Sequence, residues 1–266
     1  VGEPISEAVT MPQVPGELGD LARAMQAMRE RLEGRDYIEN HVRALTHELK
    51  SPVAAISASG ELLEGDLPAA DRQRFAAQVV AQSQRLQRLV DQMLELSKLE
   101  QRAVSGGRLQ HLQPHPLADL VRHVIAQHAP TATIKNIALY AYFMPADGPF
   151  FLKIEPDLLA LALSNLIDNA VDFSPPGSQV RIQLCEEEID QVQQVRLSVQ
   201  DAGPGVPDFA LPRLGERFFT TPRSNGQRSG SGLGLAIVQG IVRLHGGQLL
   251  LRNTSPGFCA EIRLAK

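Results

Sequence analysis

A histidine followed directly by a glutamate is the first pair of residues whose chemistry stands out in this chain. The segment from His47 to Pro52 reads HELKSP. Glu48 could accept the imidazole proton, which would leave the other ring nitrogen of His47 free to attack an electrophile. Pro52 cannot donate to the carbonyl of Glu48, so it would kink or loosen a helix at this turn. Taken alone, a surface histidine without a task explains the segment equally well.

Two asparagines on an apolar helical stretch form a second candidate group. Asn165 and Asn169 are four residues apart, which places them on one face of a helix. Amide oxygens suit a hard cation such as Mg²⁺, which keeps several waters and takes its other ligands from substrate phosphates. The pair therefore predicts a magnesium and phosphate site.

A carboxylate and two glycine-rich turns complete the chemistry-bearing residues. Asp201 ends a predicted strand and is followed by Gly203 and Gly205, so it could accept a hydrogen bond from an exocyclic amine such as that of adenine. The segment 230–234 opens a helix, where free backbone amides can cradle phosphate. Each glycine turn alone is more often only a turn. Together, in this order and spacing, the groups predict a nucleotide site.

Heptad spacing predicts the helices that carry His47. A first seam runs through residues 18–32, breaks at Gly34, and resumes in a shifted phase over 38–49. The break fits either a signal-bearing joint or a simple gap between two packed helices. A second seam runs from Phe75 to Leu96, and the turn over 64–68 between the helices predicts an antiparallel hairpin. One hairpin covers only half of this apolar seam, so we expect a homodimer with a four-helix bundle.

A different kind of domain follows a predicted linker, which contains Gly106, Gly107, Pro114 and Pro116. Alternating residues predict strands near 180–184, 195–199, 248–251 and 260–264, and a strand-loop-strand over 143–151. Helices are predicted over about 156–173 and 232–245. The expected fold class is therefore α + α/β: a helical hairpin, then an α/β sandwich with helices on one face of a mixed sheet.

Composition narrows the classes of partner. The 266 residues carry a formal net charge of -4, so the chain lacks the basic excess that favours nucleic acid. Cys185 and Cys259 have no metal-ligand spacing and are interpreted as buried free thiols. No stretch reaches the roughly 18 apolar residues that a membrane span needs. Because the chain begins with Val1, we expect an excised piece of a longer protein.

The motifs resemble those of the sensor histidine kinases of two-component signalling, over about residues 15–266. These kinases share their Bergerat, or GHKL, ATP-binding fold with Hsp90, type II topoisomerases and MutL. The matching segments are the H box (47–52), the N box (165–174), the G1 box (201–205), the F box (216–219) and the G2 box (230–234). Within the family, residues 32–37 and 169–173 are most similar to the CreC-type sensor kinases.

The resemblance implies roles for these residues. His47 would be the phosphoacceptor and Glu48 its general base, Asn169 would bind Mg²⁺, Asn165 would support the phosphate end, and Asp201 would recognise adenine. A mobile lid would extend over about 206–231. The other residues implied to contact ATP are Gly203, Gly205, Phe218, Phe219, Arg223, Arg228, Gly230, Gly232, Leu233 and Gly234.

The chain departs from the family pattern at one N-box position and leaves a second activity open. Many members have Lys or Arg where Asp172 stands, and a carboxylate there would repel polyphosphate unless it faces away or meets the metal. Arg223 or Arg228 could compensate. Ser51 stands where phosphatase-competent members usually have Thr or Asn, so its hydroxyl could orient a water.

The implied organisation has three parts. Residues 1–36 would be a partial HAMP second helix and linker, 37–104 the dimerisation and phosphotransfer domain, and 105–266 the catalytic ATP-binding domain. The resemblance also implies a response regulator as partner and a missing upstream membrane segment, which would put the fragment at the cytoplasmic face of the bacterial inner membrane. The alternatives are a nucleotide-binding scaffold and an ATPase that uses water as nucleophile.

The remaining histidines have no comparable sequence context and are interpreted as surface or turn residues. They are His41, His111, His115, His123, His128 and His245.

Overall fold

The computed structural model describes residues 43, 45–46, 48–104, 109, 112–146, 148, 150–189, 191–221 and 230–266. The chain divides into two compact units, Val1–His47 and Glu48–Lys266. Nearly all of the first unit, including His47 and the HAMP-like stretch, lies outside the described residues, as do Arg223 and Arg228. The description below therefore concerns the second unit.

The predicted helical hairpin is confirmed. A helix over residues 48–63 leads through a turn into α2 (Ala69–Val104). The predicted seam is the less exposed side of α2, where Leu89 and Leu96 are buried. Apolar side chains on the remaining surface of the hairpin stay exposed. They include Val53, Leu62, Val80, Val90 and Leu94.

A five-stranded mixed sheet forms the centre of the sandwich domain, by which we mean the described residues from 112 to 266. Its strand order is β2-β4-β5-β7-β6. β2 and β4 are parallel, and the other neighbours are antiparallel. The strands are β2 (Ala138–Met144), β4 (Gln179–Ile189), β5 (Val192–Gln200), β6 (Gln248–Asn253) and β7 (Phe258–Ala265). The predicted strands near 180–184, 195–199, 248–251 and 260–264 lie within β4, β5, β6 and β7, whereas the strand-loop-strand predicted over 143–151 overlaps β2 only at its end.

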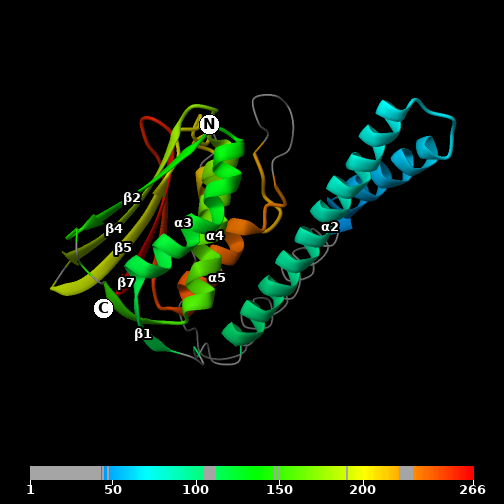
Figure 1. Ribbon diagram of the computed structural model, residues 1–266. Coiled ribbons are helices and arrows are strands. Elements are labelled where there is room, and N and C mark those ends of the chain that lie inside the picture. Colours follow the sequence, from blue (N-terminus) through cyan, green and yellow to red (C-terminus); the bar gives the residue numbers. More distant parts are fainter. Residues whose placement is uncertain are drawn as a thin grey trace, which may run out of the picture. The chain divides into compact units, whose positions relative to one another are not determined.

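Three helices cover one face of this sheet (Figure 1): α3 (Leu117–Ile134), α4 (Pro156–Phe173) and α5 (Gly234–Leu244). The core lies between the helices and the sheet, where Leu163, Ile167 and Ile182 have no exposed surface. Pro156 begins α4 because its fixed φ suits the first helical turn and its missing N–H has no partner to lose there. The N box (165–174) therefore occupies the C-terminal half of α4 and the residue that ends it, Ser174.

One prediction about residues 105–134 is wrong, and one helix in this stretch was missed. Pro114 and Pro116, assigned to a linker, lie in β1 (Gln113–Pro116), which pairs with β3 (Phe151–Ile154) in a separate two-stranded sheet. Proline is tolerated there because both strands are edges. Helix α3 was not predicted at all. It contains Pro130, yet it forms because Val121, Val124 and neighbouring apolar residues are buried against the core.

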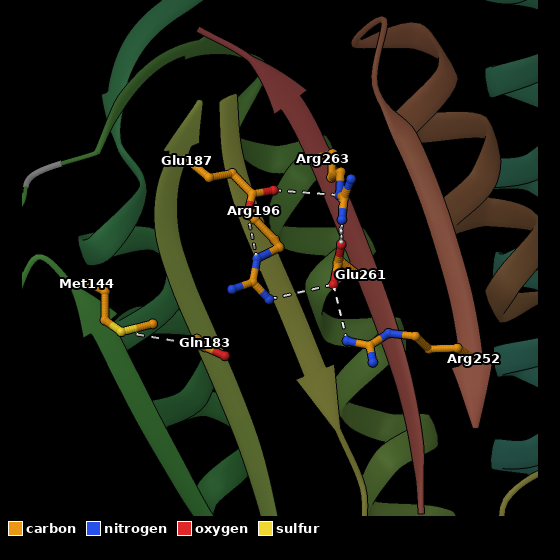
Figure 2. Close-up of polar contacts among 7 residues, drawn as sticks. All are labelled: Met144, Gln183, Glu187, Arg196, Arg252, Glu261 and Arg263. Atoms are coloured by element: carbon orange, nitrogen blue, oxygen red, sulfur yellow. Dashed lines mark hydrogen bonds and ion pairs between the residues drawn. The ribbon is translucent and has the colours of Figure 1, made fainter. Parts of the chain in front are cut away.

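An ion-pair cluster covers part of the opposite face of the sheet (Figure 2). Glu261 of β7 has a side chain only 3% exposed and lies among the guanidinium groups of Arg196, Arg252 and Arg263. Glu187 of β4 pairs with Arg196 and Arg263. The cluster therefore bridges the four neighbouring strands β4, β5, β7 and β6 with two carboxylates and three guanidinium groups.

Both cysteines are free and buried, as predicted. Burial raises the pKa of the Cys185 and Cys259 thiols, which keeps them protonated and unreactive at neutral pH. Within the described residues, no helix combines the length and apolar character that a membrane-spanning helix requires.

Candidate nucleotide-binding site

A cavity of about 630 Å³ collects most of the described residues that the sequence singled out. It is lined by residues of α4, the end of β5, the loop after it, and the start of α5. The predicted site residues that line it are Glu48, Asn165, Asn169, Asp201, Gly205, Phe219, Gly230, Gly232 and Gly234. Ser51, Gly203, Phe218 and Leu233 do not line it. The local contacts below explain these placements.

Asp201 sits at the end of β5 with one carboxylate oxygen already engaged. Its Oδ1 accepts hydrogen bonds from the backbone N–H groups of Gly203, at 2.8 Å, and Phe258, at 3.0 Å. The residue is 8% exposed, and burial raises the pKa of its carboxyl group above the ordinary value. Both hydrogen bonds end on Oδ1, so Oδ2 can accept a hydrogen bond from a ligand in the cavity. Gly203 thus contributes by orienting Asp201.

The N-box asparagines face the first residue of α5. The side-chain N–H of Asn165 donates to the carbonyl of Leu161 at 2.8 Å, which fixes the orientation of its amide. Its Oδ1 lies 3.0 Å from where a Cβ on Gly234 would stand, and Asn169 Nδ2 lies at 3.7 Å. Gly234 therefore permits a close approach between the helix that carries both amides and the N-terminus of α5.

The F box and the G2 box are joined through Gly232. The N–H of Phe218 donates to the carbonyl of Gly232 at 3.0 Å, and Phe218 adopts a φ of 60°. Gly232 has a φ of 69°, and a Cβ there would lie 2.6 Å from the backbone carbon of Phe218. Only glycine fits this position without displacing the backbone.

The two phenylalanines of the F box differ in environment. Phe218 packs against the hydrophobic core, whereas Phe219 lines the cavity. The guanidinium of Arg213 stacks on the Phe219 ring, 4.2 Å from its centroid. This cation–π contact anchors the aromatic side chain next to the cavity.

Glu48 is held within the hairpin. Its carboxylate pairs with Arg85 of α2 at 3.5 Å, and the Glu48 side chain is 12% exposed. Both residues also line the cavity and belong to the same compact unit as the sandwich domain. Glu48 is thus an oriented carboxylate directly after His47 in the chain.

The interpretation as a surface or turn residue is wrong for His128, which lies within α3 and is half-buried, whereas His245 stands in the turn after α5, as interpreted, with both ring nitrogens engaged. His245, at the C-terminus of α5, accepts from the N–H of Glu155 through Nε2 and bonds the carbonyl of Ile241 through Nδ1. Burial lowers the pKa of His245, consistent with a neutral ring. His128 of α3 bonds the carbonyl of Val124 through Nδ1 and contacts Asp168 through Nε2 at 3.2 Å.

The His128 contact ties α3 to the N-box helix. Because one ring nitrogen meets a carbonyl and the other a carboxylate, the ring is satisfied best when both nitrogens carry protons. The hydrogen bond to Asp168 is the main cause of a raised pKa for His128. Sequence reasoning missed the pair because its members lie 40 residues apart.

This pair should make stability depend on pH. Because the pKa of His128 is raised in the folded state, the pair stabilises the folded protein. This stabilisation is complete below the ordinary histidine pKa, about 6.5, and is lost as pH rises through the folded-state pKa. Because Asp168 is 65% exposed, the contribution should be only about 0.5–1 kcal/mol. We expect His128→Gln to lower the urea midpoint more at about pH 6 than at about pH 8.5. Asp168→Asn should remove the same pH dependence, and a difference independent of pH would contradict the assignment.

A second contact between α3 and α4 also escaped sequence reasoning. The ammonium of Lys135, at the C-terminus of α3, pairs with the carboxylate of Asp172 in the N box. Both residues line the cavity beside Asn169. The acidic N-box residue is therefore paired with a lysine 37 residues away in the sequence.

Comparisons with known proteins agree with this geometry. Residues 38–102 match the model of the His Kinase A (phospho-acceptor) domain, and residues 154–266 match that of the histidine kinase-, DNA gyrase B- and HSP90-like ATPases. With both domains in this order, the chain belongs to the sensor histidine kinases.

Among its relatives is the sensor protein CreC of Escherichia coli K12. The two are 40% identical over 261 residues, which is 97% of this chain and 52% of CreC. The chain thus spans about half the length of that relative. This similarity agrees with the CreC-type resemblance of residues 32–37 and 169–173.

Solved structures show the same fold. Full-length ShkA, crystallised in complex with AMPPNP, matches with a TM-score of 0.56 and 26% identity, over 85% of this chain and 45% of ShkA. The histidine kinase ThkA, in complex with the response regulator protein TrrA, matches with a TM-score of 0.67 and 20% identity, over 91% of this chain and 66% of ThkA. The hairpin followed by an α/β sandwich is therefore the architecture of this family.

Proposed function

We propose that this chain uses Mg²⁺-bound ATP to phosphorylate its own His47 and passes the phosphoryl group to an aspartate of a response regulator. The main support is the single cavity that gathers residues of the N, G1, F and G2 boxes. The match of residues 38–102 to the phosphoacceptor model adds a domain that carries His47. ShkA was crystallised in complex with AMPPNP, an ATP analogue.

In the proposed reaction, a neutral nitrogen of His47 attacks the γ-phosphorus of ATP. A nitrogen–phosphorus bond forms, the bond from the γ-phosphorus to the β,γ-bridging oxygen breaks, and ADP leaves with that electron pair. Glu48 accepts the proton that the imidazole loses, and Arg85 keeps its carboxylate oriented. Positioning and electrostatics then provide most of the rate acceleration.

The nucleotide would lie with its base at Asp201 and its phosphates near the N box. Oδ2 of Asp201 would accept a hydrogen bond from the adenine amino group. The backbone N–H groups of Gly230, Gly232 and the start of α5 would donate to phosphate oxygens. Arg223 and Arg228 remain candidates for the phosphates from the proposed lid over 206–231.

The donor set fits Mg²⁺. Asn165 and Asn169 bring amide groups to the cavity, and the described residues contain no cluster of histidine, cysteine and carboxylate ligands that would favour a tightly held transition metal. One amide oxygen, phosphates and waters form a normal Mg²⁺ shell. When bound, the ion would neutralise charge on the phosphates.

We also propose that the chain functions as a homodimer. Val53, Val80 and Leu94 are exposed on the hairpin, and burial against a second hairpin would remove them from water. A four-helix bundle is the usual solution for such surfaces. The partner that receives the phosphoryl group would be a receiver domain, since ThkA was crystallised with a response regulator protein. Exposed Ser51 could support dephosphorylation of that partner.

The domain boundaries at 36/37 and 104/105, the HAMP segment and a location at the cytoplasmic face of the inner membrane are part of the same proposal. They follow from the family resemblance. The membrane contact would come only through an upstream segment, and no nucleic acid partner is proposed.

The test is labelling of the purified chain with γ-labelled ATP and Mg²⁺. We expect acid-labile, base-stable label that maps by peptide mass spectrometry to His47 and not to His41, which serves as an internal control. Omission of Mg²⁺ should prevent labelling. ATP binding without label would support the scaffold alternative, and release of inorganic phosphate without label would support the hydrolase alternative.

A further inference from the structure

The part of the cavity wall that the sandwich domain supplies has more carboxylates than cations, which is unusual for a polyphosphate site, while the hairpin adds Glu48, Arg85 and Arg88. Among its described lining residues, the sandwich domain contributes three carboxylates, from Asp168, Asp172 and Asp201, and one cation, Lys135. Asp201 belongs to the proposed base end, and Asp168 is engaged with His128. Of the charged residues that the sandwich domain contributes, Asp172 and Lys135 therefore remain for the proposed phosphate end.

Lys135 is well placed to offset the acidic N-box residue. It caps the C-terminus of α3 and reaches across to Asp172, with each side chain about two-fifths exposed, 41% and 42%. An ammonium has three donors, and a carboxylate at one of them leaves others for phosphate oxygens. The pairing also neutralises Asp172, which removes the repulsion that an isolated carboxylate would exert on ATP.

We propose that Lys135 is a phosphate-binding residue of this nucleotide site and supplies, from α3, the positive charge that the N box lacks at position 172. The inference rests on the proposed ATP-binding function. Thr131, one turn earlier on α3, lines the same cavity, so the end of α3 forms part of its wall. Helix α3 thereby acquires a role in ligand recognition besides packing.

The test compares ATP with adenosine by calorimetry. Lys135→Gln should weaken ATP binding about tenfold, the loss expected for one charge-assisted hydrogen bond, and change adenosine binding by less than about twofold. Lys153→Gln is the matched control, because Lys153 is exposed on β3 and does not line the cavity. The control should bind both ligands like the wild type.

A relocated charge separates recognition from a purely structural ion pair. Adding Asp172→Lys to Lys135→Gln should restore ATP affinity to within about threefold of the wild type, because a cation again faces the phosphates. Equal losses for ATP and adenosine, unchanged ATP affinity in Lys135→Gln, or no rescue in the double variant would each overturn the inference.

The failure of the underlying function would look different. A wild-type chain that binds neither ATP nor adenosine would refute the nucleotide site itself, and this inference with it. A wild-type chain that binds ATP, with Lys135→Gln binding it equally well, would refute the role of Lys135 alone. Thermal melting of each variant verifies that the comparison is made on folded protein.

Discussion

Replacing Asp201 by asparagine should lower the affinity for ATP about 100-fold, or about 2.7 kcal/mol. An asparagine can keep its Oδ1 as the acceptor for the N–H groups of Gly203 and Phe258, so the turn should survive. Its amide nitrogen would replace Oδ2 and present a donor to the adenine amino group. Two donors then face each other in a buried place, which costs more than the loss of one hydrogen bond.

Calorimetry with ATP and with adenosine checks this prediction. Both ligands should weaken in parallel, because the change is at the base end, whereas Lys135→Gln should affect ATP alone. Asp208→Asn is an isosteric control at an exposed carboxylate that does not line the cavity. If Asp201→Asn bound adenosine as tightly as the wild type does, Asp201 would have no part in base recognition.

Nine of the predicted site residues line the cavity, and they could be recognised because their chemistry is local. Asp201 and its glycines lie within five residues, and the two asparagines lie one helical turn apart. The strands were predicted because one face is buried, so apolar residues alternate along β5. The same periodicity identified the buried side of α2.

Contacts between elements could not be predicted in this way. Periodicity shows that a residue is buried or exposed but does not identify its partner. Lys135 meets Asp172, and His128 meets Asp168, only because α3 packs beside α4. No element was predicted over α3 (Leu117–Ile134), and β1 was missed because its prolines suggested a linker. In both places tertiary burial outweighed local preference.

The acidic N-box residue illustrates the consequence for function. In sequence, Asp172 is a departure that sets a negative charge next to phosphates, with Arg223 and Arg228 as the available compensation. In the structure, the cation beside it comes from Lys135. A charge required at a site can thus be supplied by a neighbouring helix, and a motif compared position by position does not detect it.

Removing the charge of Glu261 should produce the largest loss of stability. We expect Glu261→Gln to lower the free energy of unfolding by about 2–4 kcal/mol, because three guanidinium groups would lose their shared, nearly inaccessible carboxylate. Arg263 donates to Glu261 from Nε and Nη2, each at 2.7 Å, and Arg196 and Arg252 approach at 3.6 and 3.5 Å. A neutral amide would place its own N–H donors against these cations.

Urea unfolding followed by tyrosine fluorescence measures the effect. The chain has three tyrosines and no tryptophan, and Tyr140 and Tyr142 both lie on β2 of the same sheet, so the signal reports mainly on the sandwich domain. The matched control is Glu186→Gln. Glu186 pairs with Lys266 at 2.8 Å, and its side chain is 29% exposed. Loss of this ion pair should lower the free energy of unfolding by less than about 1 kcal/mol.

The effect on ligand binding should be separate from the effect on stability. Glu261 projects from the sheet face opposite the helices (Figure 2), whereas the cavity lies at α4, α5 and the end of β5. Folded Glu261→Gln protein should therefore bind ATP within about twofold of the wild type, as expected for sites that share no partner. Equal stability of Glu261→Gln and Glu186→Gln would contradict a cooperative cluster. A large loss of affinity without a loss of stability would mean that the cluster acts on Asp201 through the paired ends of β5 and β7.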